Sequence, residues 1–346
     1  MLIELAVGIV LVIIPDILPA VAEEGSAAIF MSQMYGIAAF TIGFISGLVL
    51  WKSADNTLLK VFLLSMTPFH IGAAIVCFLA YQGELLPNAL QVAVFDTAFH
   101  QSIPETAFLY AIPFELYGEV RARRYGFHGT SHRYVARAAA EHLGRPLHEL
   151  NLITLHLGNG ASAAAIRGGK SVDTSMGLTP LEGLMMGTRS GDIDPALVGH
   201  LARTLDLDLA EVEKMLNKES GLVGISGISS DLRDVEREYA KGNDRARLAL
   251  EVYAYHIRKY IGSYAVALGR VDAIIFTAGV GEHASLIREW ACKGLEAIGA
   301  ILDPFKNATR HDEAIISKMS SRVKIMIIPT NEELMIARDT RTLVLG

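Results

Sequence analysis

The sequence predicts an α/β domain that is preceded by two or three transmembrane-like α-helices. The 346 residues are 51% hydrophobic and have a mean hydropathy of +0.34, which is high for an enzyme of this size that works in water. The excess of apolar residues is concentrated at the front of the chain, in long stretches without charge. From about residue 92 onward, short β-rich segments alternate with segments of helical periodicity, as they do in α/β domains.

Two segments near the N-terminus are long enough to cross a bilayer. Gly25–Trp51 and Val61–Gly83 contain no Asp, Glu, Lys or Arg, and about 20 apolar helical residues span the hydrocarbon core. The shorter run Leu5–Pro15 fits a kinked third span or an interfacial helix. Core helices are the alternative, but a core helix carries a polar stripe that these segments lack. We expect a hydrophobic membrane-like segment at 1–86 and a folded domain at 87–346.

The charges around these runs do not fix their orientation. Lys52 and Lys60 lie in the connection between the two long runs and favour a cytoplasmic position for it. The arginine cluster within 121–124 favours the cytoplasm for the following domain, which would require either one more crossing or one run that does not span the membrane. We expect membrane association through residues 1–83 with the following domain in the cytoplasm, and a cytoplasmic protein is the alternative.

The remainder of the chain reads as strand, turn and helix units. Short apolar runs end in glycine-bearing turns, and two longer segments repeat apolar residues with helical spacing. The expected strands are Asn151–Leu157, its hairpin partner Ala161–Ile166, Asp272–Thr277 and Val323–Pro329, and the expected helices are Asp208–Leu216, Arg245–Leu268, a helix beginning at Glu282, and Glu332–Thr342.

The segment YGFHGTSH at 125–132 combines two histidines, the neighbouring hydroxyl residues Thr130 and Ser131, and two glycines. Glycines let the backbone approach a ligand closely, and imidazole and hydroxyl groups donate to charged oxygens. The segment therefore predicts a loop that surrounds an anion, and a polar turn with one buried histidine is the alternative.

Two glycine turns follow predicted strands, at Gly158–Gly160 and Gly279–Gly281. Such turns expose backbone N–H groups, and a helix that begins there adds the positive end of its dipole, so both turns favour phosphate. Each could also be a turn without a ligand. Arg189, between Gly187 and Gly191, suits bidentate capture of a phosphoryl group, with a surface ion pair to Asp192 or Asp194 as the alternative. Asp96 in VAVFDTAFH is either a carboxylate presented at a strand end or a helix cap.

Five motifs in a fixed order resemble those of the acetate kinase family. They are YGFHGTSH at 125–132, HLGNGAS at 156–162, GTRSGDIDP at 187–195, TAGVGEH at 277–283 and PTNEEL at 329–334. Their order, spacing and wording agree from about Val92 to the C-terminus, which is far more specific than one glycine-rich loop. The resemblance implies the C-terminal lobe of the acetate and sugar kinase, heat-shock 70 and actin fold, which is RNase H-like. It also implies phosphoryl transfer between ATP and acetate, giving acetyl phosphate and ADP, with Mg²⁺ as a cofactor.

The resemblance also implies roles for individual residues. Asp96, His128 and Arg189 match the catalytic group, and Phe127 and Pro180 match part of the pocket for the acetate methyl group. Glu332, with Glu333 as the adjacent possibility, matches the acidic residue associated with magnesium. His283 stands where the family usually has asparagine. The residues that match the nucleotide and phosphate contacts are His156, Asn159, Gly160, Asp231, Arg233, Gly279, Val280, Gly281 and Glu282.

The front of the chain does not match the family motifs. The family begins with a strand and a glycine- and serine-rich phosphate loop, and Met1–Asn88 contains no counterpart. We therefore expect a truncated N-terminal lobe, with fewer groups around the transferred phosphoryl group. Two alternatives to a membrane-attached acetate kinase stay open. One is a non-catalytic, membrane-tethered nucleotide-binding module, and the other is a fusion of a small membrane protein with a kinase fragment.

Composition restricts the other partners. The net charge is −6 and no basic stripe carries interleaved aromatic residues, so we expect no nucleic-acid partner. Cys77 and Cys292 are too few for a disulfide framework or a cysteine metal site. The resemblance implies acetate or another short carboxylate as the acceptor and a homodimer formed through the kinase domain.

Overall fold

A computed structural model describes residues 90, 92–310 and 312–345 of the chain. The chain divides into two units, Met1–Val92 and Ala93–Gly346. The fold of the second unit is given below.

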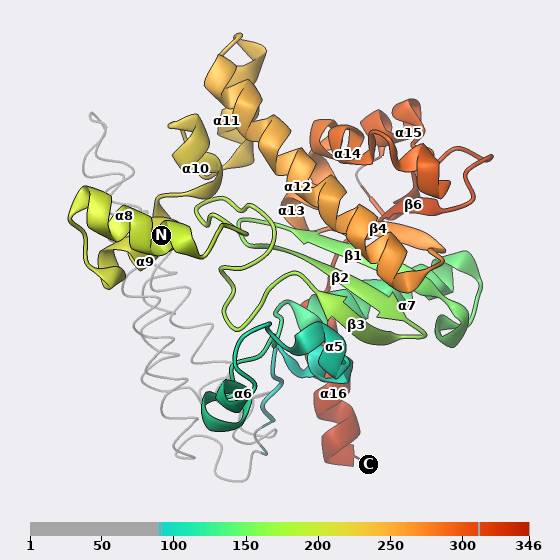
Figure 1. Cartoon of the computed structure of the whole chain (residues 1–346). Coiled ribbons are helices and arrows are strands. Elements are labelled where there is room, and N and C mark those ends of the chain that lie inside the picture. Colours follow the sequence, from blue (N-terminus) through green and yellow to red (C-terminus); the bar gives the residue numbers. More distant parts are fainter. Residues whose placement is uncertain (1–89, 91, 311, 346) are drawn as a thin grey trace, which may run out of the picture. The chain divides into compact units, whose positions relative to one another are not determined.

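One mixed six-stranded sheet forms the centre of this unit (Figure 1). Its strand order is β3-β2-β1-β4-β6-β5. The first three strands form antiparallel hairpins, β1 and β4 are parallel, β4 and β6 are parallel, and β5 is antiparallel to β6. The strands are β1 (Asn151–Leu157), β2 (Ala161–Arg167), β3 (Lys170–Thr174), β4 (Ala273–Thr277), β5 (Ala314–Ile315) and β6 (Lys324–Ile327).

Helices cover both faces of the sheet, and each face has its own buried cluster. Successive residues of a strand point to opposite faces. Ile153 and Leu155 of β1 therefore belong to the cluster beneath α12, whereas Leu152 belongs to the cluster beneath α7. Figure 1 shows α12 lying across the sheet. The helices are α5 (Glu105–Phe108), α6 (Glu115–Val120), α7 (Gly129–Leu143), α8 (Ala196–Leu205), α9 (Leu209–Lys218), α10 (Gly221–Ser226), α11 (Leu232–Ala240), α12 (Asp244–Leu268), α13 (Ala278–His283), α14 (Ser285–Cys292), α15 (Pro304–Thr309) and α16 (Glu332–Leu345), with short 3₁₀ helices η2 (Ala98–Ser102), η3 (Leu147–Glu149) and η4 (Leu295–Ile298).

Local sequence explains where the main helices begin. Asp208 caps α9 by accepting a hydrogen bond from the Glu211 N–H, while the Glu211 carboxylate accepts one from the Asp208 N–H. This reciprocal pair is a capping box. Asn243 caps α12 in a similar way, because its side-chain oxygen accepts from the backbone N–H groups of Arg245 and Ala246. Both helices therefore start within one residue of the predicted positions.

The predicted fold class is corrected at the front of the chain. Within the part that the structure describes, no helix is long and apolar enough to cross a membrane. The longest, α12, has 25 residues but includes charged ones such as Arg258 and Lys259. Segments buried on both sides also read as continuous apolar runs, so apolar length alone did not discriminate between membrane and core. The runs Leu5–Pro15, Gly25–Trp51 and Val61–Gly83 themselves lie outside the described residues.

Two local predictions differ from the structure. The segment Gly279–Gly281 is not a turn that leads to a helix at Glu282, because α13 already begins at Ala278 and ends at His283. The segment YGFHGTSH is a loop only up to His128, since Gly129 begins the 15-residue helix α7. Sequence periodicity missed α7 because its buried residues Val135, Ala136, Ala139 and Ala140 are mostly small.

Candidate active site

His128 stands at the N-cap position of α7 in a left-handed backbone conformation, with φ 55° and ψ 27°. A residue other than glycine is uncommon there, and such strain persists only where neighbouring groups hold it. Asp96 supplies one such contact, because its Oδ2 accepts a hydrogen bond from the His128 N–H at 2.7 Å. The backbone oxygen of Asp96 also accepts from the Gly129 N–H at 2.9 Å. Asp96 thus fixes the entry to α7.

Arg189 and His128 meet at Gly160. A Cβ atom added to Gly160 would lie 3.5 Å from both Arg189 Nη1 and His128 Nε2. These are ordinary van der Waals distances, so two donor groups from distant segments face the same point beside Gly160. The predicted phosphoryl residues His128, Gly160 and Arg189 are brought together.

The Arg189 guanidinium is anchored by one nitrogen. Its Nη1 donates to Pro180 O at 3.2 Å and contacts Met186 Sδ at 3.5 Å. Among residues 92–310 and 312–345, Nε and Nη2 have no hydrogen-bond partner and the guanidinium has no carboxylate partner. Asp192 instead binds the Gly183 N–H and the Tyr260 hydroxyl. The predicted surface ion pair with Asp192 is therefore not formed, and the Nε and Nη2 side of the Arg189 guanidinium can bind an anion.

Gly187 brings the segment of Arg189 against the turn at Asn159. The Gly187 N–H donates to Asn159 O at 3.0 Å. A Cβ atom on Gly187 would overlap Asn159 Oδ1 and would lie 2.9 Å from Ser230 O. Only glycine permits this approach of three segments.

Four histidines and several hydroxyl groups lie behind this point, on the α7 face of the sheet. His128 Nδ1 is 2.9 Å from Ser162 Oγ, and its ring stacks on His156 with centroids 4.1 Å apart. His132 Nε2 is 2.8 Å from the same Ser162 Oγ, and its Nδ1 is 2.7 Å from Thr154 Oγ1. These contacts arise because alternate residues of β1 and β2 point toward α7.

Burial keeps the imidazoles neutral. It lowers the pKa of His156 to about 3 and that of His100 to about 4. The pKa of His132 is well below its usual value for the same reason, with further lowering by neighbouring histidines. The pKa of His128 is also lowered by burial, against an opposing effect of Asp96. Neutral rings can donate from one nitrogen and accept at the other.

Two carboxylates approach the same region. Burial raises the pKa of Glu332, and the negative charge of Asp96 raises it further. Two like charges in proximity favour a cation between them. No group of three or more metal-ligating side chains occurs within the described ranges. A site with one or two carboxylates is nevertheless typical of Mg²⁺, which takes its other ligands from water and phosphates.

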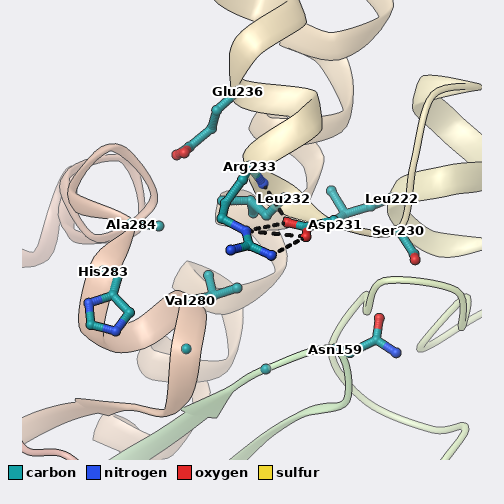
Figure 2. A pocket seen from close by; sticks show the side chains of 12 residues that line it. Asn159, Leu222, Ser230, Asp231, Leu232, Arg233, Glu236, Val280, His283 and Ala284 are labelled. Atoms are coloured by element: carbon teal, nitrogen blue, oxygen red, sulfur yellow. Dashed lines mark hydrogen bonds and ion pairs between the residues drawn. The ribbon is translucent and has the colours of Figure 1, made fainter. Parts of the chain in front are cut away.

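A cavity of about 530 Å³ lies beside the turn at Asn159 (Figure 2). Asn159, Asp231, Arg233, Gly279 and Val280 of the predicted residues line it. Figure 2 shows the Asp231–Arg233 pair between Glu236 and Val280, with Asn159 on another side of the cavity. The side chains that sequence reasoning missed are Leu222, Ser230, Leu232 and Glu236.

The Asp231–Arg233 pair is exposed and mutually bound. Arg233 Nη2 donates to Asp231 Oδ2 at 2.5 Å, and Arg233 Nε donates to Asp231 Oδ1 at 3.0 Å. Asp231 also caps α11, since its Oδ1 accepts from the Arg233 N–H. These bonds to Arg233 lower the pKa of Asp231 to about 2. Burial raises the pKa of the nearby Glu236 carboxyl.

Four residues predicted to contact the nucleotide or its phosphates do not line the cavity, namely His156, Gly160, Gly281 and Glu282. Gly281 packs against the end of β4, where an added Cβ would lie 3.2 Å from Phe276 C. The carbonyl groups of Gly281 and Glu282 accept from Arg288 Nη1 at 2.9 and 2.8 Å. Arg288 is fully buried, and burial lowers its pKa to about 10. Nothing in the sequence marked it, because an arginine on a helix is ordinarily exposed.

Phe127 and Pro180 lie on two segments that are joined by backbone hydrogen bonds. The Gly126 N–H donates to Gly177 O at 3.2 Å, and the Gly177 N–H donates to Thr179 O. Phe127 is half-buried against the cluster beneath α12. The two predicted pocket residues are therefore attached to one framework.

The chain matches the model of the acetokinase family over residues 55–338. The match begins well before Val92 and inside the segment that was predicted to be membrane-like. The start of the family resemblance is therefore corrected to residue 55, and the proposal that the front of the chain is unrelated to the family is not supported.

Individual relatives agree with the family match. An acetate kinase of Geobacillus sp. (strain WCH70) is 58% identical over 274 residues, which are 79% of this chain and 69% of that protein. The crystal structure of Porphyromonas gingivalis acetate kinase aligns with a TM-score of 0.74 and 42% identity, over 89% of this chain and 72% of the other. A propionate kinase from Francisella tularensis aligns with a TM-score of 0.71 and 42% identity, over 83% and 73%. These solved structures support the acetate kinase-like α/β fold.

Proposed function

The chain belongs to the acetokinase family, and on this premise we propose that it transfers a phosphoryl group between ATP and acetate, giving acetyl phosphate and ADP. The chain is thus a phosphotransferase with a carboxylate acceptor. The observation that carries the assignment is the convergence of Arg189 Nη1 and His128 Nε2 at Gly160. The alternatives of an inactive module or a fusion product are not favoured.

Phosphoryl transfer requires donors around the equatorial oxygens of the transferred group and alignment of the attacking and leaving oxygens. We assign donation to these oxygens to Arg189 Nε and Nη2, which have no hydrogen-bond partner among the described residues, and to the His128 ring. The carboxylate oxygen of acetate then forms a bond to the γ-phosphorus as the bond to ADP breaks. We call Asp96, His128, Gly160 and Arg189 the phosphoryl end.

The cavity beside Asn159 is assigned to the nucleotide. Its size of about 530 Å³ lies within the range of small-molecule sites, which are about 300–1,000 Å³. Gly279 and Val280 approach it from α13, and the Asp231–Arg233 pair approaches it from α11. We call Asn159, Asp231, Arg233, Gly279 and Val280 the nucleotide end. We propose that His156 acts by stacking on His128 rather than by touching the nucleotide.

Asp96 and Glu332 are the residues that would hold Mg²⁺. Burial and, to a smaller extent, the negative charge of Asp96 raise the pKa of Glu332, and a divalent cation would relieve the repulsion between the two carboxylates. When bound, Mg²⁺ supplies positive charge to the phosphate oxygens. Asp96 meanwhile keeps the His128 backbone in place through its Oδ2.

We propose that the acceptor is a short carboxylate held near Phe127 and Pro180. Pro180 O accepts a hydrogen bond from Arg189, so an acceptor beside Pro180 lies next to the phosphoryl end. Acetate is the acceptor that the family assigns, and one solved relative is a propionate kinase. The discrimination between the two rests on one methylene group, which is worth only about 1–3 kcal/mol.

We also propose a homodimer formed through α12. Leu248, Tyr255 and Val266 lie on one face of this helix and are 47%, 54% and 83% exposed. We infer that these exposed apolar side chains, with the Lys259 ammonium group over the Tyr255 ring, form part of the interface. Light scattering on the intact chain and on Val266→Lys tests this, since the substitution should shift the mass toward that of a monomer.

Hydroxylamine trapping of acyl phosphate tests the reaction. The purified full chain is given Mg-ATP with acetate, propionate or no acceptor, beside a His128→Gln variant. We expect acyl hydroxamate with acetate, less with propionate, none without acceptor, and a strong reduction in the variant. Equal signals from the two proteins would overturn the assignment.

A further inference from the structure

Four groups form one hydrogen-bonded chain that ends at His128. Thr154 Oγ1 is 2.7 Å from His132 Nδ1, His132 Nε2 is 2.8 Å from Ser162 Oγ, and Ser162 Oγ is 2.9 Å from His128 Nδ1. Thr154, His132 and Ser162 are all fully buried. The chain therefore runs from the interior of the sheet to the phosphoryl end without contact with water.

While the rings are neutral, only two arrangements of the protons use the Ser162 hydroxyl proton within this hydrogen-bonded series. An arrangement in which both rings donate to Ser162 would leave that buried proton without an acceptor, which is unfavourable. A hydroxyl group has one proton to donate, and a neutral imidazole donates at one nitrogen and accepts at the other. If one bond has a given direction, the neighbouring bonds must follow it. The His132 ring is fully buried beside Thr154 and Ser162, and this burial, which lowers the pKa of His132, favours its neutral form.

Thr154, at the buried end of this hydrogen-bonded series, determines the direction in which the hydrogen bonds run. Thr154 Oγ1 has no other hydrogen bond among the residues that the structure describes. If His132 donated to Thr154, the Thr154 hydroxyl proton would be left buried without an acceptor, which is unfavourable. Thr154 must therefore donate to His132 Nδ1. His132 Nε2–H then donates to Ser162, and Ser162 donates to His128 Nδ1.

We propose that Thr154, His132 and Ser162 are positioning residues that hold His128 in the tautomer with its proton on Nε2. This inference rests on the proposed function, in which His128 Nε2 faces the transferred phosphoryl group. An Nε2–H group donates to a phosphoryl oxygen, whereas the opposite tautomer presents a lone pair to it. The parallel ring of His156 at 4.1 Å keeps the imidazole plane in place.

The other groups near the His128 ring, Asp96 and Arg189, do not fix its tautomer. The Asp96 carboxylate binds the backbone N–H of His128 and not its ring. Arg189 carries only donors, and no hydrogen bond joins it to the His128 ring in the described structure. Before the nucleotide binds, the only hydrogen bond that the described residues make to the His128 ring is therefore that to Ser162.

Nitrogen NMR reads the tautomer directly. The full chain is labelled with ¹⁵N-histidine, the long-range ¹H–¹⁵N correlations of the ring nitrogens are recorded without ligand, and the His128 signals are identified by their loss in His128→Gln. We expect an unprotonated Nδ1 and a protonated Nε2 for both His128 and His132. A protonated Nδ1 at either ring would overturn the proposal.

Two isosteric variants test the role of the buried end. Thr154→Val removes the hydroxyl group but keeps the shape, and Thr154→Ser keeps the donor. We expect Thr154→Val to produce a second His128 tautomer and Thr154→Ser to retain the wild-type spectrum. Thr174→Val is the matched control, because the Thr174 hydroxyl group is also buried but donates to the backbone oxygen of Ala163 at 3.0 Å, and its loss should leave the His128 tautomer unchanged. A spectrum from Thr154→Val that equals the wild-type one would contradict the proposal.

Kinetics separate this inference from the proposed function. Ser162→Ala should lower kcat about fivefold to tenfold, the effect of one lost hydrogen bond, and leave the KM for ATP unchanged. If the protein forms no acetyl phosphate but the tautomers are as expected, the proposed function is wrong and the positioning role of Thr154, His132 and Ser162 is retained. If acetyl phosphate forms normally and Ser162→Ala retains both full kcat and the wild-type ring shifts of His128, the positioning role is wrong and the proposed function is retained.

Discussion

Around His128 the side chains are half-buried and bound to backbone or hydroxyl groups, whereas around Arg233 they are exposed and bound to each other. His128 is held by Asp96, Ser162 and the stacked His156. Arg233 is 84% exposed and contacts Asp231 two residues away. A rigid, partly desolvated arrangement stabilises developing charge more than an exposed one does. The comparison indicates that the phosphoryl end determines the rate of the chemical step and the nucleotide end determines affinity.

Removal of Asp96 should have the largest effect. Asp96→Ala deletes the acceptor for the His128 N–H and the carboxylate beside Glu332. We expect kcat to fall about 10²- to 10³-fold, as when one preorganised group is lost from an oxyanion hole. Steady-state acetyl phosphate formation measures this.

Asp194→Ala is the matched control for that substitution. Its carboxylate also accepts a backbone N–H, from Ala196 at 2.9 Å, but it lies outside both ends of the site. The comparison between the two ends breaks if Asp96→Ala and Asp194→Ala have equal activity.

A single methyl group at Gly187 should disturb both ends at once. Gly187→Ala places a Cβ against Asn159 Oδ1 and 2.9 Å from Ser230 O. Because a displacement of about 1 Å can lower a rate 10²-fold, we expect a loss of about that size in kcat/KM. Gly118→Ala, at an open position of α6, is the control and should retain activity. Wild-type kcat/KM in Gly187→Ala would mean that the close approach has no function.

The buried histidines make the folded state sensitive to acid. The pKa of His100 is about 4 in the folded chain and about 6.5 when exposed. Between these values the unfolded chain binds the extra proton, so stability is present above pH 6.5 and is lost as the pH falls toward 4. Each such histidine contributes a slope of about 1.4 kcal/mol per pH unit.

Urea unfolding between pH 7 and 5 measures that slope. His100→Gln should reduce the slope by the contribution of one histidine, whereas the exposed His200→Gln should leave it unchanged. A free energy of unfolding that is independent of pH in this interval would exclude the buried, neutral histidine cluster.

The nucleotide end should give the smallest effect. Arg233→Ala is expected to raise the KM for ATP about threefold to tenfold, as for one exposed charged contact, with little change in kcat. Arg237→Ala, whose partner Asp234 lies on the same helix outside the cavity, is the control. A large fall in kcat for Arg233→Ala would place this residue in the chemical step.

The strands around the site could be predicted because each is a short apolar run that ends at turn-forming residues. The boundaries of β1 and the turn Gly158–Gly160 were predicted as observed. The segments that contain His128, Gly160 and Arg189 could be predicted as parts of an anion site, because such segments combine glycines with imidazole or guanidinium side chains. Their roles in catalysis stay predictions.

Other parts of the site could not be read from the sequence. Ser162 and Thr154 read as ordinary strand residues, and only the register of β1 with β2 and the position of α7 bring them to His132. Glu236 and Leu222 line the cavity through the packing of α11 and α10. The charge-free runs at the front were assigned to a membrane from their apolar length alone, and they lie outside the described residues.

The most direct test compares Arg189→Ala with Arg233→Ala. For each variant, kcat for acetyl phosphate formation is measured at saturating ATP and ATP affinity is measured by calorimetry. The test asks whether the phosphoryl end sets kcat and the nucleotide end sets affinity. We expect Arg189→Ala to lose about 10²- to 10³-fold in kcat with ATP affinity nearly retained, and Arg233→Ala to lose affinity with kcat nearly retained. Full kcat in Arg189→Ala would contradict the assignment of Arg189 and His128 to the transferred phosphoryl group.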